Sequence, residues 1–373
     1  TGRCGCLMVV SISSHAIAPA VVLRGEGAWA EARSKISALC ARPLLLGRSQ
    51  ATSSLRSGLA SDLVQCGLTP QLAELRYDCC EEDLQRLASE AADCDAVLAA
   101  GGGKVLDAGK LLAHRLQLPC ITVPLSAATC AGWTALANLY SMHGAFQGDV
   151  ALARCPDLLV FDHGLVRQAP ARTLASGIAD ALAKWYEASV SSGDSSDGLV
   201  QQAVQMARVL RDQLLIDGQM ALQDPHSAAW ARTAEACALT AGVMGGLGGA
   251  RCRTVAAHAV HNGLTQLQAC HHVLHGEKVG FGILVQLRLE ERLGGNRLAG
   301  QAHRQLLPLM RQLQLPVSLD DLGLSAASLS DLQEVCAFAC REGSDLHHLP
   351  FAVTPGALLE ALVGAAEPIP AVP

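Results

Sequence analysis

The sequence predicts a chain of two parts, a doubly wound α/β N-terminal domain built on a parallel sheet and an all-helical C-terminal domain. A chain of 373 residues is too long for a single hydrophobic core. Short β-rich runs alternate with helical patterns up to Asp162, which is typical of parallel strands covered by helices. After Asp162 the strand signals stop and helical spacing of apolar residues continues to the end. We therefore place the domains at residues 1–163 and 164–373.

The elements of the first domain follow one another with connections of a few residues. Ahead of Ala20 a short apolar run lacks strand or helical continuity, and we expect an extension there. Apolar, β-rich runs predict strands at 20–25, 43–47, 73–78, 95–100, 119–124 and 157–162. Helical patterns lie between them at 28–40, 53–66, 81–92 and 104–117.

The second half reads as helical because apolar residues recur there at i, i+3, i+4 and i+7. The expected helices are 167–190, 197–216, 225–247, 254–268, 279–293, 297–314, 329–341 and 355–364. A polar run rich in Ser and Gly at 189–198 predicts a loop between two of them.

Composition limits the class of partner. Half of the residues are apolar and 17% are charged, which indicates a well-buried globular protein. A net charge of −6 offers no basic excess for nucleic acid or an anionic membrane, so we expect a small-molecule substrate. No apolar run reaches the roughly 18 residues of a membrane helix. Fifteen cysteines without regular spacing indicate reduced thiols, and we expect a cytoplasmic protein.

A glycine-rich stretch directly follows the predicted strand 95–100 and opens a helix. It comprises Gly101, Gly102, Gly103 and Lys104, with Asp107 one turn later. Glycines let a backbone approach closely, and the helix N-terminus offers free N–H groups to a pyrophosphate. The spacing matches neither GxGxxG nor the P-loop, and a turn made only for tight packing is the alternative. We interpret the stretch as a dinucleotide site at the carboxyl ends of the strands.

Two neighbouring segments refine this site. Residues 125–134 follow the strand 119–124 and are suited to wrap the nicotinamide end of the cofactor. The second strand ends at Gly47 and Arg48 without the acid that binds the ribose of NAD, whereas an Arg suits the 2′-phosphate of NADP. We favour NADP(H) over NAD(H), with Arg48 as the candidate contact; a solvated charge is the alternative.

Asp180, His258 and His275 are candidate ligands of one metal ion. The two histidines stand seventeen residues apart, and Asp180 lies in an otherwise apolar helical pattern. A catalytic metal site needs about three protein ligands, and a buried carboxylate is costly unless paired or metal-bound. Core histidines and a salt bridge between Asp180 and Lys184 are the alternatives. A metal here would act as a Lewis acid on a hydroxyl or carbonyl group.

Two further residues near His258 are candidates for the chemistry. His261 lies one turn after His258 and is a candidate proton relay, with a core or orienting role as the alternative. Arg253 precedes His258 by five residues and is a candidate partner for a substrate carboxylate, with a structural ion pair as the alternative.

Five motifs in order carry a resemblance to a known family: GGGKVLDAGK, VPLSAATCAGWTALANLY, GIADALAKWYEA, GLGGARCRTVAAHAVHNGLT and HGEKVGFGILVQ. Over roughly residues 18 to 364 the chain resembles the glycerol-dehydrogenase-like branch of the iron-containing alcohol dehydrogenase family, and most of all its bacterial hydroxycarboxylate dehydrogenases. The resemblance implies the dehydroquinate-synthase-like fold of a dinucleotide-binding domain and a helical metal-binding domain. It further implies hydride transfer between NAD or NADP and a small alcohol, 2-hydroxy acid or 2-oxo acid. A divalent Zn²⁺ or Fe²⁺ and a homo-oligomer, dimer or octamer, are implied as well.

The resemblance also assigns residues. It implies that Asp180, His258 and His275 bind the metal. It implies a cofactor-binding set comprising Gly103, Lys104, Asp107, Thr129, Thr134, Leu136 and Tyr140.

The chain departs from the family pattern at four places. Cys130 stands where glycerol dehydrogenases have an Asp that contacts the polyol, which puts glycerol in doubt. Leu125 and Ala128 lose two hydroxyl contacts to the cofactor. Gly47 replaces the second-strand Asp, which puts NAD in doubt. Lys184 stands where longer-chain members have a histidine ligand, which leaves three protein ligands and makes zinc as plausible as iron.

Three rival functions stay open at this point. Glycerol oxidation is the main alternative substrate reaction. A dehydroquinate-synthase-like lyase would need a cluster of Lys, Arg and Asn that the apolar segment 125–139 does not offer. A non-catalytic dinucleotide sensor is disfavoured by the intact set of metal ligands.

Overall fold

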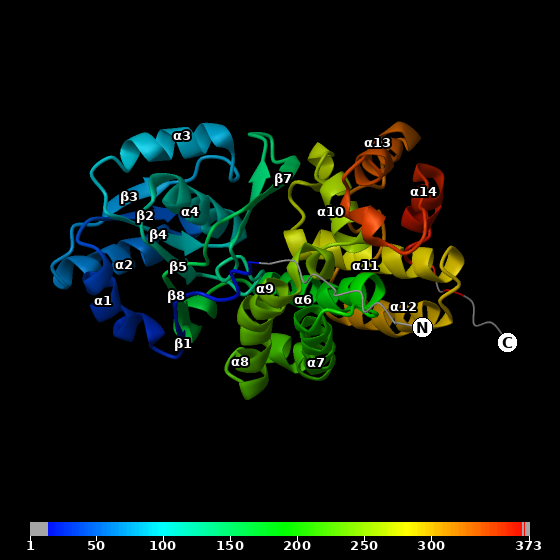
Figure 1. Cartoon of the computed structure of the whole chain (residues 1–373), viewed down its shortest axis with the longest axis horizontal. Helices are drawn as coiled ribbons and strands as arrows, with labels where there is room; N and C mark the ends of the chain where they lie inside the picture. Colours follow the sequence, from blue (N-terminus) through cyan, green and yellow to red (C-terminus); the bar gives the residue numbers. More distant parts are fainter. Residues whose placement is uncertain (1–13, 368, 370–373) are drawn as a thin grey trace, which may run out of the picture.

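The computed structural model describes residues 14–367 and residue 369. In Figure 1 a part that contains the large sheet lies beside a part made of helices. The elements of the first part are β1 Val21–Gly25, α1 Ala28–Leu39, β2 Pro43–Gly47, α2 Ser53–Gln65, β3 Gln71–Glu74, α3 Glu81–Glu90, β4 Ala96–Gly101, α4 Gly103–Leu116, β5 Cys120–Pro124, β6 Leu136–Tyr140, β7 Phe146–Ala151, β8 Leu158–Asp162 and the short α5 His163–Val166.

The large sheet is parallel throughout, with the strand order β1-β8-β5-β4-β2-β3. Side chains of a strand alternate between its two faces, so each face needs its own cover. Leu45 packs in the core formed with α1 and α2, whereas Leu44 and Leu46 pack in the core formed with α3 and α4. Figure 1 shows these helix pairs on opposite sides of the sheet. The doubly wound α/β fold is thereby confirmed.

Three expectations for this part need correction. The third strand ends at Glu74 rather than 78, because the backbone N–H groups of Arg76 and Tyr77 donate to the Asp83 carboxylate instead of a neighbouring strand. The antiparallel pair β6 and β7 was not predicted, since β7 carries Gly and Asp, which are depleted in strands. The predicted extension falls mainly on residues 1–13, outside the described residues, but Ile17 already accepts a hydrogen bond from Trp133.

The second part is helical, as expected. Its elements are α6 Ala171–Ser192, α7 Gly198–Gln223, α8 Ala228–Glu235, a π-helix Ala236–Thr240, α9 Ala241–Arg253, α10 Ala256–Leu264, α11 His275–Arg292, α12 Arg297–Gln312, α13 Leu329–Ala339 and α14 Pro355–Val363. The single helix expected at 225–247 is thus interrupted by the π-helix. The loop expected at 189–198 is shorter, because α6 continues to Ser192.

α6 and α11 cross at van der Waals contact of their backbones. A Cβ atom on Gly276 would lie 1.8 Å from the carbonyl oxygen of Ser176, so only glycine fits at this crossing. Small residues along α6, many of them Ala, let its neighbours approach. The crossing brings the first residue of α11, His275, close to the middle of α6.

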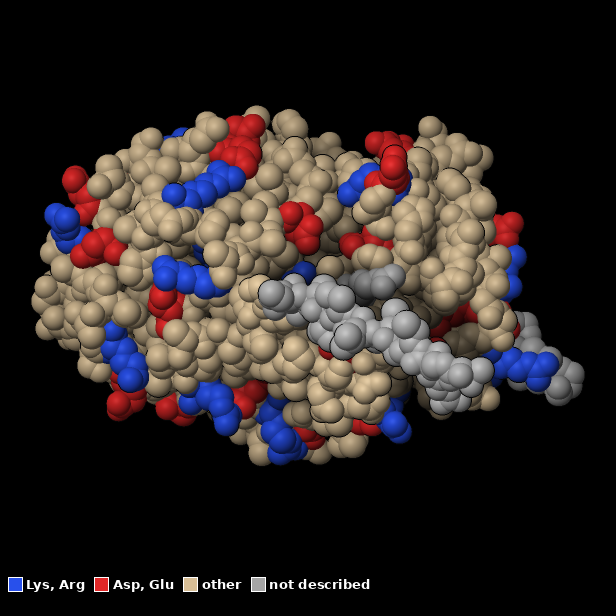
Figure 2. All heavy atoms as spheres, viewed as in Figure 1, with Lys and Arg blue, Asp and Glu red and all other residues tan. Residues whose placement is uncertain are grey.

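The surface shows no strong charge segregation on the face drawn in Figure 2, where acidic and basic side chains are interspersed. Within the described residues, no helix is both long and apolar enough to cross a lipid bilayer. Every cysteine in the described part of the chain is a free thiol.

Candidate active site

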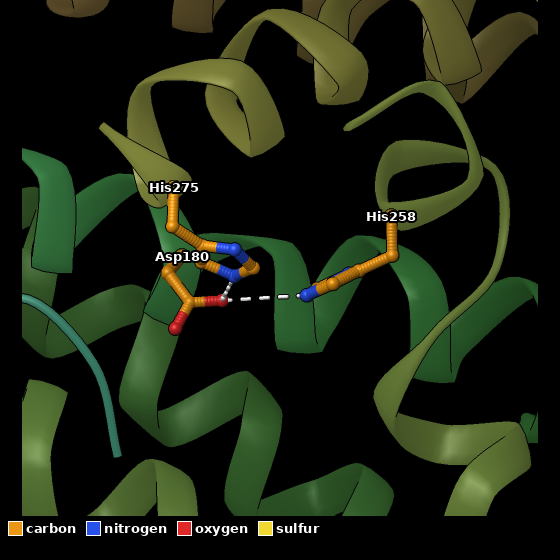
Figure 3. Close-up of side chains that lie close together, drawn as sticks. All are labelled: Asp180, His258 and His275. Atoms are coloured by element: carbon orange, nitrogen blue, oxygen red, sulfur yellow. Dashed lines mark ion pairs between the residues drawn. The ribbon is translucent and has the colours of Figure 1, made fainter. Parts of the chain in front are cut away.

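Asp180, His258 and His275 converge as predicted, although they come from three different helices (Figure 3). Asp180 lies mid-way along α6, His258 is on α10, and His275 begins α11. The Oδ1 atom of Asp180 lies 3.5 Å from Nε2 of His258 and 3.7 Å from Nε2 of His275. Tetrahedral zinc with bonds near 2.05 Å requires ligand-to-ligand distances of about 3.4 Å. One carboxylate and two imidazoles at these distances fit a divalent metal ion.

One face of α6 supplies three charged groups to this site. Asp180, Lys184 and Glu187 stand at i, i+4 and i+7, which places them on the same side of a helix. Lys184 Nζ lies 3.1 Å from Asp180 Oδ1, the same oxygen that faces both histidines. The expected alternative, a salt bridge between Asp180 and Lys184, is therefore present together with the triad rather than instead of it.

Glu187 orients His258. Its carboxylate is fully buried and hydrogen-bonded to Nδ1 of His258 at 2.7 Å, and it accepts the backbone N–H groups of Val255 and His258. An imidazole that gives its Nδ1 hydrogen to a carboxylate keeps Nε2 free for a metal. Nothing in the sequence except the helical spacing from Asp180 indicated this role for Glu187.

His275 is oriented by a second chain of hydrogen bonds. Its Nδ1 lies 2.9 Å from Nε2 of His261, whose Nδ1 lies 2.9 Å from the side-chain oxygen of Asn262. The amide oxygen can only accept, so the hydrogens run from His275 to His261 to Asn262 and leave Nε2 of His275 free. Burial lowers the pKa of His261 well below its usual value, in keeping with a neutral ring.

The electrostatics of the triad favour a cation among the three side chains. Burial acts to raise the pKa of Asp180, but Lys184, His258 and His275 together hold it well below its usual range. Burial acts to lower the pKa of His258, but Glu187 and Asp180 raise it to about 9. His258 thus lies between two carboxylates, which is a position suited to a cation.

A cavity of about 400 Å³ runs from the glycine-rich stretch to the triad. It is lined by all the residues predicted for metal, cofactor and substrate except His261: Arg48, Gly101, Gly102, Gly103, Lys104, Asp107, Thr129, Cys130, Thr134, Leu136, Tyr140, Asp180, Arg253, His258 and His275. His261 lies behind His275 instead, hydrogen-bonded to that ring and to Asn262, and its role as a proton relay stays a prediction.

The cofactor end of the cavity is held together by ion pairs that the sequence did not indicate. Asp78, just after β3, pairs with both Arg48 and Lys104. The Lys104 ammonium also lies 5.1 Å from the centre of the Tyr140 ring. Because Asp78 is distant in sequence from both cations, no local pattern signals this bridge.

A second buried ion pair fixes the β6–β7 hairpin, the antiparallel pair of strands, to α4. Lys110 pairs with Asp107 at 3.0 Å and donates to backbone carbonyl oxygens of Thr134 and Leu136. Asp107 in turn accepts the backbone N–H of Asn138. Burial raises the pKa of Asp107, a rise that Lys110 opposes. These contacts position Thr134 and Leu136 along the cavity wall.

At the far end the cavity is bordered by Cys130, Lys184, Arg253 and Asp345. Burial raises the pKa of the Cys130 thiol, while Lys184 opposes that rise more than Arg253 does. The thiol is therefore a small neutral group beside two cations.

The fold and the site define an enzyme that combines a dinucleotide-binding sheet with a metal-binding helical part. The model of the iron-containing alcohol dehydrogenase family matches residues 19–163. An uncharacterised oxidoreductase of Synechocystis is 53% identical over 94% of this chain and 91% of its own length. Hydroxycarboxylate dehydrogenase A of Escherichia coli K12 is 36% identical over 77% of this chain and 79% of its own length. A probable glycerol dehydrogenase of Sinorhizobium meliloti, a crystal structure, has a TM-score of 0.83, 29% identity, and coverage of 94% of this chain and 97% of its own.

The chain belongs to the iron-containing alcohol dehydrogenase family. It is an oxidoreductase that acts on alcohol groups. The family and the triad imply a nicotinamide dinucleotide and one divalent metal ion as cofactors. The domain limits at residues 163 and 164 stay a prediction.

Proposed function

We propose that this protein interconverts a small 2-oxo acid and its 2-hydroxy acid with NADP(H), at a divalent metal ion held by Asp180, His258 and His275. The observation that supports the acid substrate is Arg253, which lines the cavity beside the triad and has no carboxylate partner among the described residues. Cys130 supports it too, because a thiol replaces the carboxylate that would repel an acid. A relative bears the name hydroxycarboxylate dehydrogenase A.

The choice of NADP(H) is supported by the side chain that packs against Gly47 at the end of β2. A Cβ atom on Gly47 would lie 2.0 Å from Cδ of Arg56, so the guanidinium side chain fills the place an acidic residue would need. Arg56 also donates to the carbonyl oxygen of Ser49 at 3.2 Å. Arg48, Ser49 and Thr52 line the cavity there, just ahead of the N-terminus of α2. A guanidinium and hydroxyl groups at this strand end suit a 2′-phosphate.

The chain's own residues prepare this reaction. Reduction adds a hydride from C4 of the nicotinamide and one proton to the carbonyl group. A bound divalent ion would supply Lewis acidity that polarises the carbonyl oxygen. Glu187 and His261 hold the two imidazoles with Nε2 turned to the triad. The glycine-rich stretch provides room and N–H groups for the pyrophosphate, and Arg253 aligns the acid.

The test is a set of initial rates with protein stripped by a chelator and protein reloaded with Zn²⁺. We expect metal-dependent oxidation of NADPH by pyruvate, faster than with NADH and abolished in Asp180→Ala. Metal-dependent reduction of NAD⁺ by glycerol without activity on 2-oxo acids would overturn the substrate and cofactor in favour of polyol oxidation. The free thiols suit the reducing cytoplasm, where we place the protein.

A further inference from the structure

We infer that Lys184 and Arg253 together bind the carboxylate of the substrate, and that Lys184 sets the preference for 2-oxo acids over neutral ketones. The inference rests on the proposed function and adds the residue that selects the substrate. It arises from two cations that line the same cavity as the triad. Among residues 14–367, Asp180 is the one carboxylate that pairs with either of them.

Lys184 is a buried cation with a shared partner. Its side chain is 7% exposed, and Asp180 is the only described carboxylate within 4 Å of its ammonium group. The oxygen that it contacts is also the one that faces both histidines. A divalent ion held by the triad would draw on this same oxygen and so compete with Lys184 for it. A buried ammonium group is costly without an anion, so the site favours a ligand that brings one.

Arg253 lies at the end of α9 and is held at the cavity by its stem. A Cβ atom on Gly245 would lie 2.9 Å from Cδ of Arg253, so the absence of a side chain there makes room for the arginine. The Nε atom of Arg253 is buried and has no hydrogen-bond partner among the described residues. An arginine offers parallel N–H groups that match the two oxygens of a carboxylate, whereas a lysine acts as a point charge.

Cys130 connects the two cations. Its thiol interacts electrostatically with both Lys184 and Arg253. An aspartate at this position would add a negative charge near both cations. The small neutral thiol instead leaves both cations available to a ligand of the cavity.

The charges around the triad leave a positive excess for the substrate. The carboxylates of Asp180 and Glu187 balance a divalent ion, and Lys184 and Arg253 then add two positive charges. Asp345 also lines the cavity, and its ionised form offsets only one of these two positive charges. Of the other carboxylates that line it, Asp107 is paired with Lys110, and Asp149 is exposed on β7. A monoanionic substrate matches this excess, whereas a neutral ketone leaves it unmatched.

The experiment compares pyruvate with hydroxyacetone, which share a methyl ketone and differ in a carboxylate against a hydroxymethyl group. In Lys184→Met we expect kcat/KM for pyruvate to fall about 10- to 100-fold, since a charge-assisted hydrogen bond is lost. The value for hydroxyacetone should fall by a clearly smaller factor, because that substrate brings no carboxylate to the site. The matched control is Lys35→Met, because Lys35 is an exposed lysine on α1. Metal content is measured for each variant.

Binding supplies a readout that does not depend on turnover. Oxamate, an unreactive analogue of a 2-oxo acid, is titrated into Zn²⁺-loaded protein with bound NADPH. Its affinity should fall by the same factor in Lys184→Met and in Arg253→Met, so the second variant carries the test if the first does not fold. Equal losses for pyruvate and hydroxyacetone together with unchanged oxamate affinity would overturn the inference.

The two hypotheses fail in different ways. If wild-type protein turns over neither ketone but binds oxamate in a Lys184-dependent manner, the carboxylate site stands and the proposed reaction falls. If wild-type protein reduces hydroxyacetone as efficiently as pyruvate, hydride transfer stands and the role of Lys184 is overturned.

Discussion

Replacing Glu187 by glutamine should weaken metal binding without changing any metal ligand. The carboxylate has three hydrogen bonds, of which Oε1 accepts the backbone N–H groups of Val255 at 2.7 Å and His258 at 3.0 Å. A glutamine places its carbonyl oxygen there and turns its NH₂ group to Nδ1 of His258, 2.7 Å from Oε2 in the wild type. Two donors then face each other. Nδ1 must become the acceptor, which moves the imidazole hydrogen to Nε2, the atom that the metal needs.

The expected size of this effect follows from the role of Glu187 as the partner of a ligand. Loss of such a partner weakens metal affinity roughly 10- to 100-fold, or about 1.4–2.7 kcal/mol. The assay is competition for Zn²⁺ against a chelator of known affinity at pH 7.5. Glu290→Gln is the matched control, because Glu290 is a buried glutamate on α11 that is hydrogen-bonded to Gln286 and Asn296 and not to the triad. Unchanged affinity in Glu187→Gln, or an equal loss in the control, would refute the reasoning.

Two further predictions concern stability. Burial raises the pKa of Glu290 from 4.5 to about 7, so its contribution to the free energy of unfolding is fully present below pH 4.5 and is lost as the pH rises through 7. In urea unfolding, the free energy of unfolding of the wild type should fall by about 2.5 kcal/mol more than that of Glu290→Gln between pH 5 and pH 8; parallel curves would contradict this. Gly276→Ala should destabilise the metal-free protein by about 1–3 kcal/mol, because its Cβ atom would meet Ser176 at 1.8 Å. Gly58→Ala, with no atom within 4 Å of its Cβ, should instead stabilise α2 by about 1 kcal/mol in the same thermal melts, and a similar loss in both would contradict the packing argument.

The parallel sheet was predictable because its signals are local. Each strand is a short apolar run, and burial on both faces removes any need for alternation, so runs such as 43–47 stand out. The triad was predictable for a related reason. A carboxylate such as Asp180 in an apolar helix demands a partner, and His258 and His275 are residue types that meet this demand through a metal.

The residues that were missed act through contacts between distant segments. Asp78 follows a strand end and bridges Arg48 and Lys104, which no spacing rule brings together. Glu187 has its role because the start of α10 places two N–H groups and an imidazole against its carboxylate. Hairpin β6–β7 escaped because its second strand has a composition that favours turns. In each case tertiary packing decides the role.

The hairpin also constrains how this scaffold can be recombined. It belongs to the sheet-bearing part of the chain, but the backbone N–H of Phe146 donates to Thr265 at 3.0 Å and its carbonyl oxygen accepts from Gln266 at 3.2 Å. Figure 1 shows β7 reaching towards α10 accordingly. A chimera that exchanges the cofactor half at residue 163 would carry the hairpin across and leave its two polar anchors behind. Exchange of cofactor halves between relatives therefore has to transplant Thr265 and Gln266 as well.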